Sequence, residues 1–595
     1  MRSLIPLGLL IWGVAPWISA QSYSDYLGAG HNNGITAITS HEENSQEGGG
    51  TSVDGFPISD PDLLADASRF LSQATLGYDF EMVQQVAAMG YEAWLDEQMS
   101  LPAEPTTGIS LDLEERLGEE GPIYGMFTFR SAWLNQVLRS NDLLRHRMNY
   151  ALSQIFVVST FGSDLFEDVT MLSSGYYDLL GQNAFGNYRD LLAGISTNVS
   201  MGLYLSHLNN PKSDPANNIH PDENYAREIM QLFSIGLYEL NNDGTRKLSP
   251  DGNFIATYNN DDIREFAKVF TGFGTGGPGG SFGGGDEENY EAAANYPMAM
   301  YDEWHEPGEK HLLNGMVVPA GQTGQQDYEM AIDNLYQHPN VGPFISKALI
   351  QFYVSANPSP AYINRVATVF NDNGQGERGD LGAVLKAILL DPEARDCSAI
   401  NNATAGKLRE PLVRYTQFLK AFNVSNPAGF FLDPMYTWGE NVGQVPMYSP
   451  SVFNFYQPEF QPNGPIAEQN LVAPVFQIHN SSTAIGYINM VNQWTFLEYP
   501  MDDLTEEVVD ETNLEVNLRA EMDYSNEYGI VDDPVELLDR LNLLLAAGQL
   551  SDNTQQVILT ALQEVEEPFN RLNLAIYLVL ISPDYAILKK SFFVY

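Results

Sequence analysis

Apolar residues recur at every third or fourth position along most of the chain, which is the spacing of an amphipathic helix. Strict alternation of apolar and polar residues, the pattern of a half-buried strand, is scarce. We therefore predict a mainly α fold: a large multi-helix domain with long irregular loops and at most a few short β-hairpins. The segments with helical spacing are 61–74, 80–99, 124–139, 143–158, 176–192, 220–237, 263–270, 326–338, 341–355, 361–371, 381–390, 407–422, 484–496, 534–547, 553–564 and 569–581.

Residues 220–237 carry the most informative of these patterns. We predict a single helix, with Pro221 in its first position, Asp222 in its first turn and Gly236 at its end. Its apolar residues cover an arc of roughly 220°, far wider than a surface helix needs, so the helix is expected to lie inside the protein. The polar residues share the remaining strip: Glu223, Asn224, Arg227, Glu228, Gln231 and Ser234.

Charged side chains on a buried helix need either partners or a ligand. One hypothesis makes the strip catalytic, with Glu223 or Glu228 as acid or base and Arg227 holding an anionic group. The simpler alternative is an ion pair between Glu223 and Arg227 at i, i+4, which needs no function. The sequence slightly favours this alternative.

Further groups for such a site lie elsewhere in the chain. In the catalytic hypothesis, His305 and Lys310 approach the strip from the side of a glycine-rich loop. The segment 304–311 also holds Glu306, and its histidines can serve a metal from a loop, but a hydrogen-bonded structural role is favoured and no metal or cofactor is predicted. The residues expected to bind the ligand are Asn224, Gln231 and Asp262.

Several loops interrupt the helical patterns. Residues 272–285 are rich in glycine and formally match a dinucleotide fingerprint, but a helix precedes them and Pro278 follows, so we predict a flexible lid or surface excursion. Three Asx-rich turns within 241–262 frame an expected hairpin near 254–258. Their side-chain oxygens leave calcium open as a ligand, but no window fits an EF-hand and turns use these residues anyway. An acidic, solvated excursion is expected at 498–533.

Charge narrows the range of partners. The chain of 595 residues has 29 basic and 77 acidic side chains, for a formal net charge of −48. Such a surface repels phosphate backbones and anionic lipids, so we expect no nucleic acid partner. The single cysteine, Cys397, excludes an internal disulfide and a cysteine-based zinc or iron–sulfur site.

The N-terminus indicates export. Residues 1–20 combine a basic start, a short apolar run and small residues before a cleavage point near Ala20, which is typical of a signal peptide. Residues 21–59 form an acidic, glycine- and serine-rich segment that is expected to be disordered, and 60–595 a single large helical domain. No later stretch is long and apolar enough to predict a membrane span. The expected location is periplasmic or extracellular.

Several unusual strings, in order along the chain, suggest a family. The strongest is Glu-Asn-Tyr-Ala-Arg-Glu at 223–228. With these strings the sequence resembles the bacterial family catalogued as domain of unknown function 1800. The other strings are 69–77, 94–98, 144–148, 262–263, 271–273, 305 with 310, 338–339, 378–381, 449–453 and 582–585.

The resemblance implies an exported, mostly helical protein whose biochemical activity is not established. Members are often encoded beside a protein of another family of unknown function, numbered 1501, that resembles sulfatases and alkaline phosphatases. Many shorter members carry His-Asn-His before a Phe-Val-Val-Ser pattern and a histidine late in the 223–228 helix. This chain has Ser153, Gln154 and Ile155 at the first place and Phe233 at the second, so a histidine site of the relatives is missing or altered here.

Two functions follow as hypotheses. The first is an exported binding or assembly protein that works beside a sulfatase- or phosphatase-like partner, because no nucleophile, cofactor or metal signature is recognised. The alternative is an extracytoplasmic hydrolase or lyase that uses Glu223 or Glu228 with Arg227, His305 and Lys310.

Overall fold

The computed structural model describes residues 60–117, 126–284, 287–395, 405–432, 439, 441–496 and 521–588. The predicted signal peptide, the acidic segment 21–59 and residues 498–520 of the predicted excursion lie outside the described residues. The described residues belong to one compact unit that spans 52–592. They are mainly α-helical, with two small antiparallel sheets of two strands each, so the predicted fold class is confirmed.

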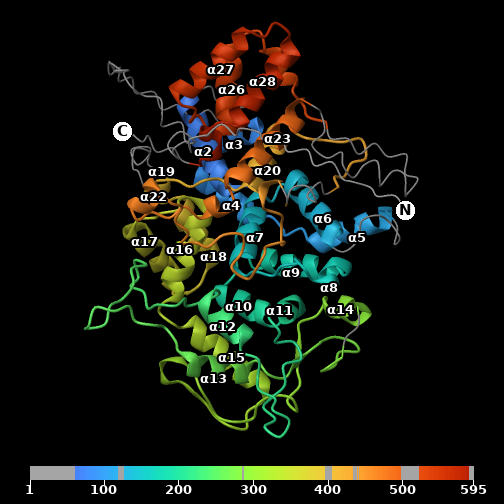
Figure 1. Ribbon diagram of the computed structural model, residues 1–595, viewed down its shortest axis with the longest axis vertical. Helices are drawn as coiled ribbons and strands as arrows, with labels where there is room; N and C mark the ends of the chain where they lie inside the picture. Colours follow the sequence, from blue (N-terminus) through green and yellow to red (C-terminus); the bar gives the residue numbers. More distant parts are fainter. Residues whose placement is uncertain are drawn as a thin grey trace, which may run out of the picture. The chain divides into compact units, whose positions relative to one another are not determined.

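Helices follow one another along most of the described chain (Figure 1). Their bounds are α2 Pro61–Ala74, α3 Phe80–Met89, α4 Tyr91–Ser100, α5 Thr106–Leu117, α6 Met126–Arg139, α7 Leu143–Ile155, α8 Asp164–Asp168, α9 Thr170–Gln182, α10 Tyr188–Ser196, α11 Val199–Tyr204, α12 Asn224–Gln231, α13 Asn260–Val269, α14 Glu287–Ala293, α15 Gly324–Tyr336, α16 Val341–Tyr353, α17 Pro360–Asn371, α18 Leu381–Leu389, α19 Pro392–Arg395, α20 Pro411–Ala421, α22 Pro465–Glu468, α23 Ser481–Phe496, α25 Ser525–Gly529, α26 Pro534–Ala546, α27 Asp552–Gln563, α28 Pro568–Leu580 and α29 Pro583–Ala586.

Local chemistry explains where the helices begin and end. Asp60 caps α2 by accepting from the backbone N–H groups of its first turn, so this helix has its predicted bounds. The segment 80–99 is two helices rather than one, because Gly90 adopts a φ of 82° that ends α3. The segment 176–192 is also divided: α9 ends at Gln182, and α10 begins after Asn187, whose side chain accepts from Arg189 N.

The stretch 220–237 is a shorter helix than predicted. Asn210 accepts from Asp222 N at 2.9 Å, and Asp222 accepts from Asn224 N at 2.7 Å, so the chain before Asn224 stays outside the helix. At the other end the hydrogen bonds widen: Gly236 N donates to Met230 O at 3.0 Å and its φ is 69°. Helix α12 therefore covers only Asn224–Gln231.

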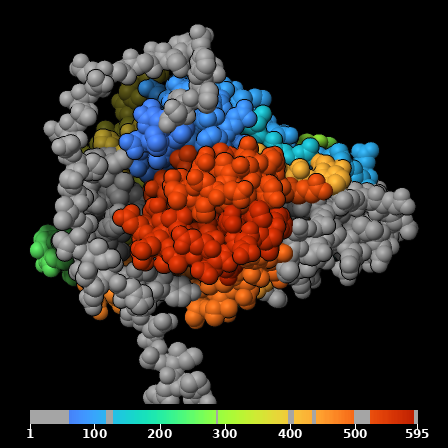
Figure 2. Space-filling model, turned by 90° about the horizontal axis from the view of Figure 1, so that it is seen from above, coloured from blue at the N-terminus to red at the C-terminus, as the bar shows by residue number. Residues whose placement is uncertain are grey.

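The two ends of the described chain pack on each other. Helices α26, α27 and α28 contact one another, and α26 also contacts α2 and α20. Figure 2 shows these C-terminal residues beside the N-terminal helices. Ser68 Oγ on α2 donates to Leu543 O on α26 at 2.6 Å. Within the predicted acidic excursion, Glu527 on α25 is buried and its carboxylate lies 2.5 Å from Arg540, so at least this residue is folded rather than solvated.

A second group of elements surrounds α12. Helix α13 contacts α12, α15 and β3. Strand β1 (Phe273–Gly274) pairs with β2 (Ala299–Met300), and β3 (Lys310–His311) pairs with β4 (Val317–Val318). The start of the glycine-rich segment is thus buried, with Phe273–Gly274 in a strand, whereas residues 277–279 are exposed, as a surface excursion would be. A Cβ at Gly276 would lie 2.0 Å from Pro297 O, so only glycine fits there.

Between α12 and α13 the chain makes three short extended segments, which we call the three-segment ladder (237–257). Glu239, Lys247 and Ile255, one from each segment and eight residues apart, form a ring of three backbone hydrogen bonds. Lys247 N donates to Glu239 O at 2.7 Å, Ile255 N to Lys247 O at 3.3 Å, and Glu239 N to Ile255 O at 2.8 Å. The predicted hairpin at 254–258 is therefore the last part of a larger unit. The ladder projects from the neighbouring helices (Figure 1).

Candidate functional site

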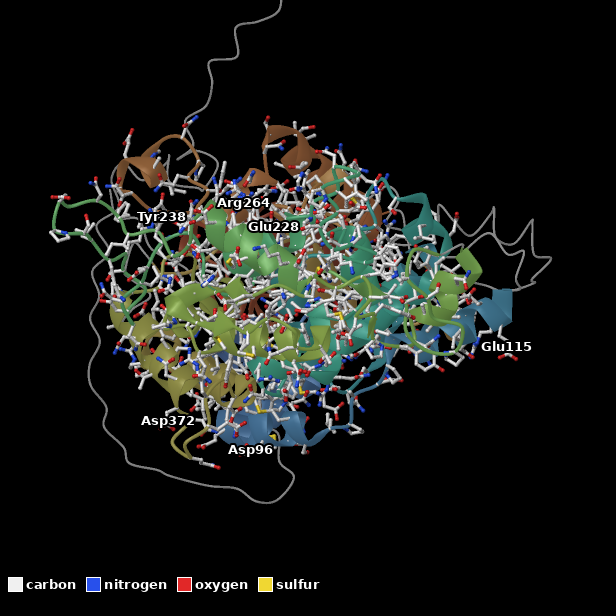
Figure 3. The ribbon with its side chains drawn as sticks, turned by 90° about the horizontal axis from the view of Figure 1, so that it is seen from below. Asp96, Glu115, Glu228, Tyr238, Arg264 and Asp372 are labelled. Carbon is white, nitrogen blue, oxygen red and sulfur yellow. The ribbon has the colours of Figure 1, made fainter. Side chains whose placement is uncertain are left out.

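The charged strip of α12 lies partly at the surface. The side chains of Glu223 and Arg227 are each 41% exposed, and their closest charged atoms are 3.6 Å apart. Arg264 of α13 approaches Glu223 at 3.8 Å and pairs with Asp261 at 2.7 Å. Figure 3 labels Arg264 and the neighbouring Glu228. The i, i+4 pair of the simpler alternative is present, as one link in a solvated network.

The three predicted binding residues have local partners. Asn224 is exposed, and its amide nitrogen lies 3.5 Å from Ser206 Oγ. Gln231 accepts from the Tyr258 hydroxyl at 3.1 Å. Asp262 accepts from Asn259 N at 2.8 Å as half of the capping box that starts α13. Each contact is of a kind that stabilises the fold, and Asp262 acts as a helix cap.

Glu228 is the one carboxyl of the strip that is buried. It is 6% exposed, and its Oε2 has no hydrogen-bond partner among the described residues. Burial raises the pKa of Glu228, although nearby Arg227 opposes that change. Burial, reinforced by Glu228, also raises the pKa of Tyr204 and of Tyr258 to about 12. A carboxyl that keeps its proton above the ordinary range suits a general acid.

His305 and Lys310 meet at a different place. Asp327 of α15 accepts from Lys310 Nζ at 2.6 Å and lies 3.0 Å from His305 Nε2. All three side chains are at most 2% exposed. Burial alone would raise the pKa of Asp327, but the hydrogen bonds from Lys310, His305 and Gln322 outweigh it and lower that pKa. A buried, ionised carboxylate thus pairs with two basic groups.

The hydrogen-bonding capacity of this buried cluster is used internally. Lys310 Nζ donates to Glu306 O at 2.6 Å, to Gly308 O at 3.0 Å and to Asp327. These three hydrogen bonds use all three protons of the Lys310 ammonium. The second ring nitrogen of His305 faces Thr271 O at 2.9 Å. The cluster fastens the segment 304–310 to α15 and to the end of α13, and no donor is left for a substrate.

The predicted catalytic residues therefore fall into two groups. Helix α13 lies between them: its Glu265 accepts from His311 N at 3.0 Å on one side, and Arg264 approaches Glu223 on the other. Among the described residues, no hydrogen bond or ion pair joins the α12 carboxylates to His305 or Lys310. The structure does not bring the five residues into one constellation.

Metal ligands are not gathered within the described ranges. No group of three or more His, Cys, Asp or Glu residues there is arranged to hold an ion. The Asx turns use their own oxygens: Asp243 accepts from Thr245 N at 3.0 Å and from its hydroxyl at 2.6 Å. In the same ranges no helix has the length and apolar character needed to cross a membrane.

Sequence reasoning missed a buried polar network around Glu410. This carboxylate is 1% exposed; its Oε2 accepts from Tyr150 Oη at 2.5 Å, Gln154 Nε2 at 3.0 Å and Gln444 Nε2 at 2.8 Å. Lys407 lies 3.6 Å away. Burial would raise the pKa of Glu410, but the positive charges of Lys407 and Arg147 lower it. The available signal was Gln154, which stands at the place where the resemblance implies His-Asn-His in many shorter members.

The second departure from the relatives lies next to the first. Phe233 is fully buried, and its ring centroid is 5.7 Å from that of Phe156, the residue that follows Ile155. Tyr188 also donates to Phe233 O from within the core. Aromatic packing therefore surrounds Phe233, the second place at which the resemblance implies a histidine in many shorter members.

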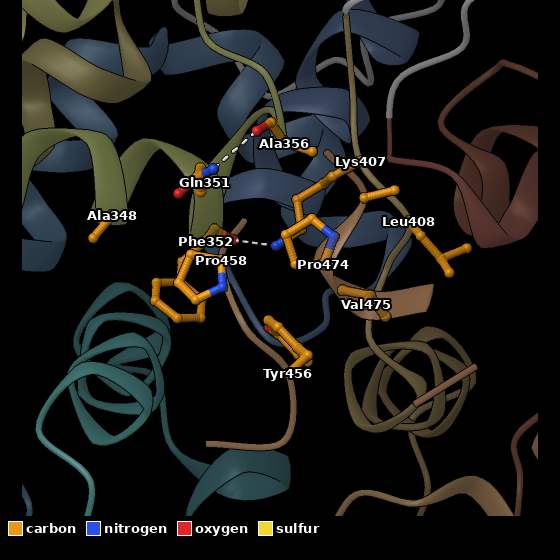
Figure 4. Close-up of a pocket in the computed structure, with 11 residues that line it drawn as sticks. Ala348, Gln351, Phe352, Ala356, Lys407, Leu408, Tyr456, Pro458, Pro474 and Val475 are labelled. Carbon is orange, nitrogen blue, oxygen red and sulfur yellow. Dashed lines mark hydrogen bonds between the residues drawn. The ribbon is translucent and has the colours of Figure 1, made fainter. Parts of the chain in front are cut away.

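An apolar pocket adjoins the Glu410 network (Figure 4). The space in it that a water-sized sphere can occupy is about 40 Å³. Lys407 is the only lysine or arginine that lines it, and Tyr456, a neighbour of Gln154 in the network, lines it too. The structure thus places a buried amine beside an apolar space, which no sequence pattern indicated.

Comparison with known proteins agrees with the strings in the sequence. A family model described as "Protein of unknown function (DUF1800)" matches residues 69–587, nearly the whole chain. No match was found among curated proteins or among solved structures. The matched range includes α12, the buried cluster of His305 and the Glu410 network. The chain therefore belongs to the DUF1800 family of proteins of unknown function.

Proposed function

We propose that this chain is an exported binding or assembly protein that works beside an enzyme, with a sulfatase- or phosphatase-like protein of the family numbered 1501 as its partner. Export is supported by residues 1–20, which resemble a signal peptide. The partner is supported by the resemblance to the family. The observation that carries the proposal is the exposed face of the three-segment ladder. It is further supported by the separation of the predicted catalytic residues into two groups.

The exposed face of the ladder has the composition of a protein interface. Tyr238, Arg246 and Phe254 stand eight residues apart, and the Arg246 guanidinium lies 4.8 Å from the Tyr238 ring centroid and 5.1 Å from that of Phe254. Leu248 is bridged to Phe254 across the ladder, which puts both on one face, and they are 58% and 51% exposed. Aromatic and arginine side chains dominate binding energy at interfaces.

Two substitutions on this face test the proposal. Phe254→Asp and Leu248→Asp are each expected to weaken binding of the purified partner by about tenfold or more, because each loses an apolar contact and buries a charge. Titration calorimetry of the full-length variants measures the change. Both residues are exposed, so the melting temperature should stay near that of the wild type.

Val557→Asp is the matched control. Val557 is 57% exposed but lies on α27, at the other end of the described fold from the ladder (Figure 1). It is expected to leave binding unchanged. Unaltered affinity in both ladder variants, or an equal loss in the control, would contradict the proposal.

A hydrolase or lyase remains the second candidate because of one observation, the buried and raised-pKa carboxyl of Glu228. Here Glu228 is the acid and Arg227 holds an anionic group, without His305 and Lys310. Glu228→Gln and Arg227→Met are expected to abolish turnover of an ester or polymer substrate while melting stays normal if this candidate is right. Lost folding in Glu228→Gln would instead indicate a structural carboxyl.

A further inference from the structure

The apolar pocket beside the Glu410 network is walled by the end of α16 and by the irregular chain before α23 (Figure 4). Its lining includes Ala348, Phe352, Leu408, Tyr456, Pro474 and Val475. Lys407 enters among these side chains, and its Nζ donates to Phe352 O at 2.8 Å. The amine thus stands at the edge of a space that favours apolar molecules.

The charges around this amine are unusual. Glu410 lies 3.6 Å from Lys407 Nζ, and Arg147, which also donates to Phe352 O, adds a second buried positive charge. Burial lowers the pKa of Lys407 to about 8, with Arg147 acting in the same direction and Glu410 against it. Burial thus shifts the side chain toward the free amine, which is the nucleophilic form.

We propose that this pocket takes a small apolar carbonyl compound and that Lys407 Nζ binds it covalently as an iminium ion. The ammonium first passes a proton to Glu410. The amine nitrogen then forms a bond to the carbonyl carbon, and the carbonyl oxygen takes up a proton from the nitrogen to become a hydroxyl. Glu410 returns its proton to that hydroxyl, the C–O bond breaks, and water leaves.

The reaction neither creates nor removes charge in the buried pocket. One ammonium and one carbonyl compound give one iminium and one water, with no oxidant, reductant or outside proton. The positive charge stays on the same nitrogen, so its ion pair with Glu410 is kept. A buried charge pair that survives the reaction avoids the penalty of leaving a lone charge in the interior.

Lys420 is a matched internal control. Burial lowers its pKa to about 8 as well, and its Nζ donates to Val137 O at 3.2 Å and to Leu138 O at 3.3 Å, so it resembles Lys407 in basicity and contacts. It does not line the apolar pocket. A difference in reactivity between the two lysines therefore reports on the pocket.

The test treats the full-length protein at about pH 8 with butanal and cyanoborohydride, which fixes an iminium as a butyl amine, and maps the products by peptide mass spectrometry. Lys407 is expected to be labelled about tenfold faster than Lys420, with saturation as butanal is raised. Glycolaldehyde, which is short and polar, should label Lys407 about tenfold less because it lacks the buried methylene groups. Lys407→Arg keeps the positive charge and should remove the saturable label.

Equal labelling of the two lysines would overturn the proposal. So would labelling of Lys407 that never saturates, or that glycolaldehyde matches. Because the wild-type protein supplies the comparison with Lys420, the result stands even where Lys407→Arg fails to fold.

Discussion

Replacing Asp327 with alanine is expected to lower the free energy of unfolding by about 3–5 kcal/mol, the usual cost of breaking a buried ion pair from one side. The substitution leaves Lys310 and His305 facing each other at 2% exposure or less without their shared acceptor. It also frees the segment 304–310 from α15. Denaturant unfolding followed by circular dichroism measures the loss.

Two comparisons show whether this cost comes from the buried pair. Asp112→Ala removes an exposed i, i+4 pair with Arg116 and should cost at most about 0.5 kcal/mol. The contribution of Asp327 should also depend on pH. Its folded pKa is lowered, so its stabilisation is present above the unfolded value of about 4 and fades as the pH falls through the folded pKa. Equal losses of unfolding free energy in Asp327→Ala and Asp112→Ala would contradict a buried ion pair at Asp327. So would a difference between Asp327→Ala and the wild type that stays the same in acid.

Glu410→Ala is expected to have an effect of similar size, about 3–5 kcal/mol. It removes the acceptor of Tyr150, Gln154 and Gln444 and leaves the Lys407 ammonium without its counter-ion. Thermal and denaturant unfolding of the variant measure the cost.

A double-mutant cycle identifies the charge pair as the source. Adding Lys407→Met to Glu410→Ala removes the uncompensated charge, so the double variant should lose about 0.5–3 kcal/mol less than the sum of the single variants. Strict additivity would mean that the two side chains do not interact in the folded protein.

The hydrophobic pattern predicted the helices well where local signals act alone. Asp60 caps the start of α2 as its residue type suggests, whereas Gly236 lies beyond the end of α12, which stops at Gln231. The start of α12 could not be predicted, because it depends on Asn210, which is distant from the helix in sequence and holds Asp222 outside it. The burial of Phe273 and Gly276 in β1 and its surroundings likewise depends on pairing with a strand more than twenty residues later.

The candidate site was only partly accessible to sequence reasoning. The residue types of His305 and Lys310 made them candidate site residues, but their partner Asp327 lies on α15, further along the chain. Only the fold shows that the three side chains are buried together. The Glu410 network draws on α7, α20 and the irregular chain near Gln444. Each of these residues is ordinary in its own segment, so no local pattern points to the network.

The central claim is that the chain acts by binding a partner through the three-segment ladder. Hydrogen–deuterium exchange of the full-length protein, alone and with the purified sulfatase- or phosphatase-like partner, tests it most directly. We predict slower exchange of the ladder amides at 237–257 on binding, with little change in α26–α28. Slower exchange confined to α12 (Asn224–Gln231), or no slower exchange anywhere, would contradict the claim.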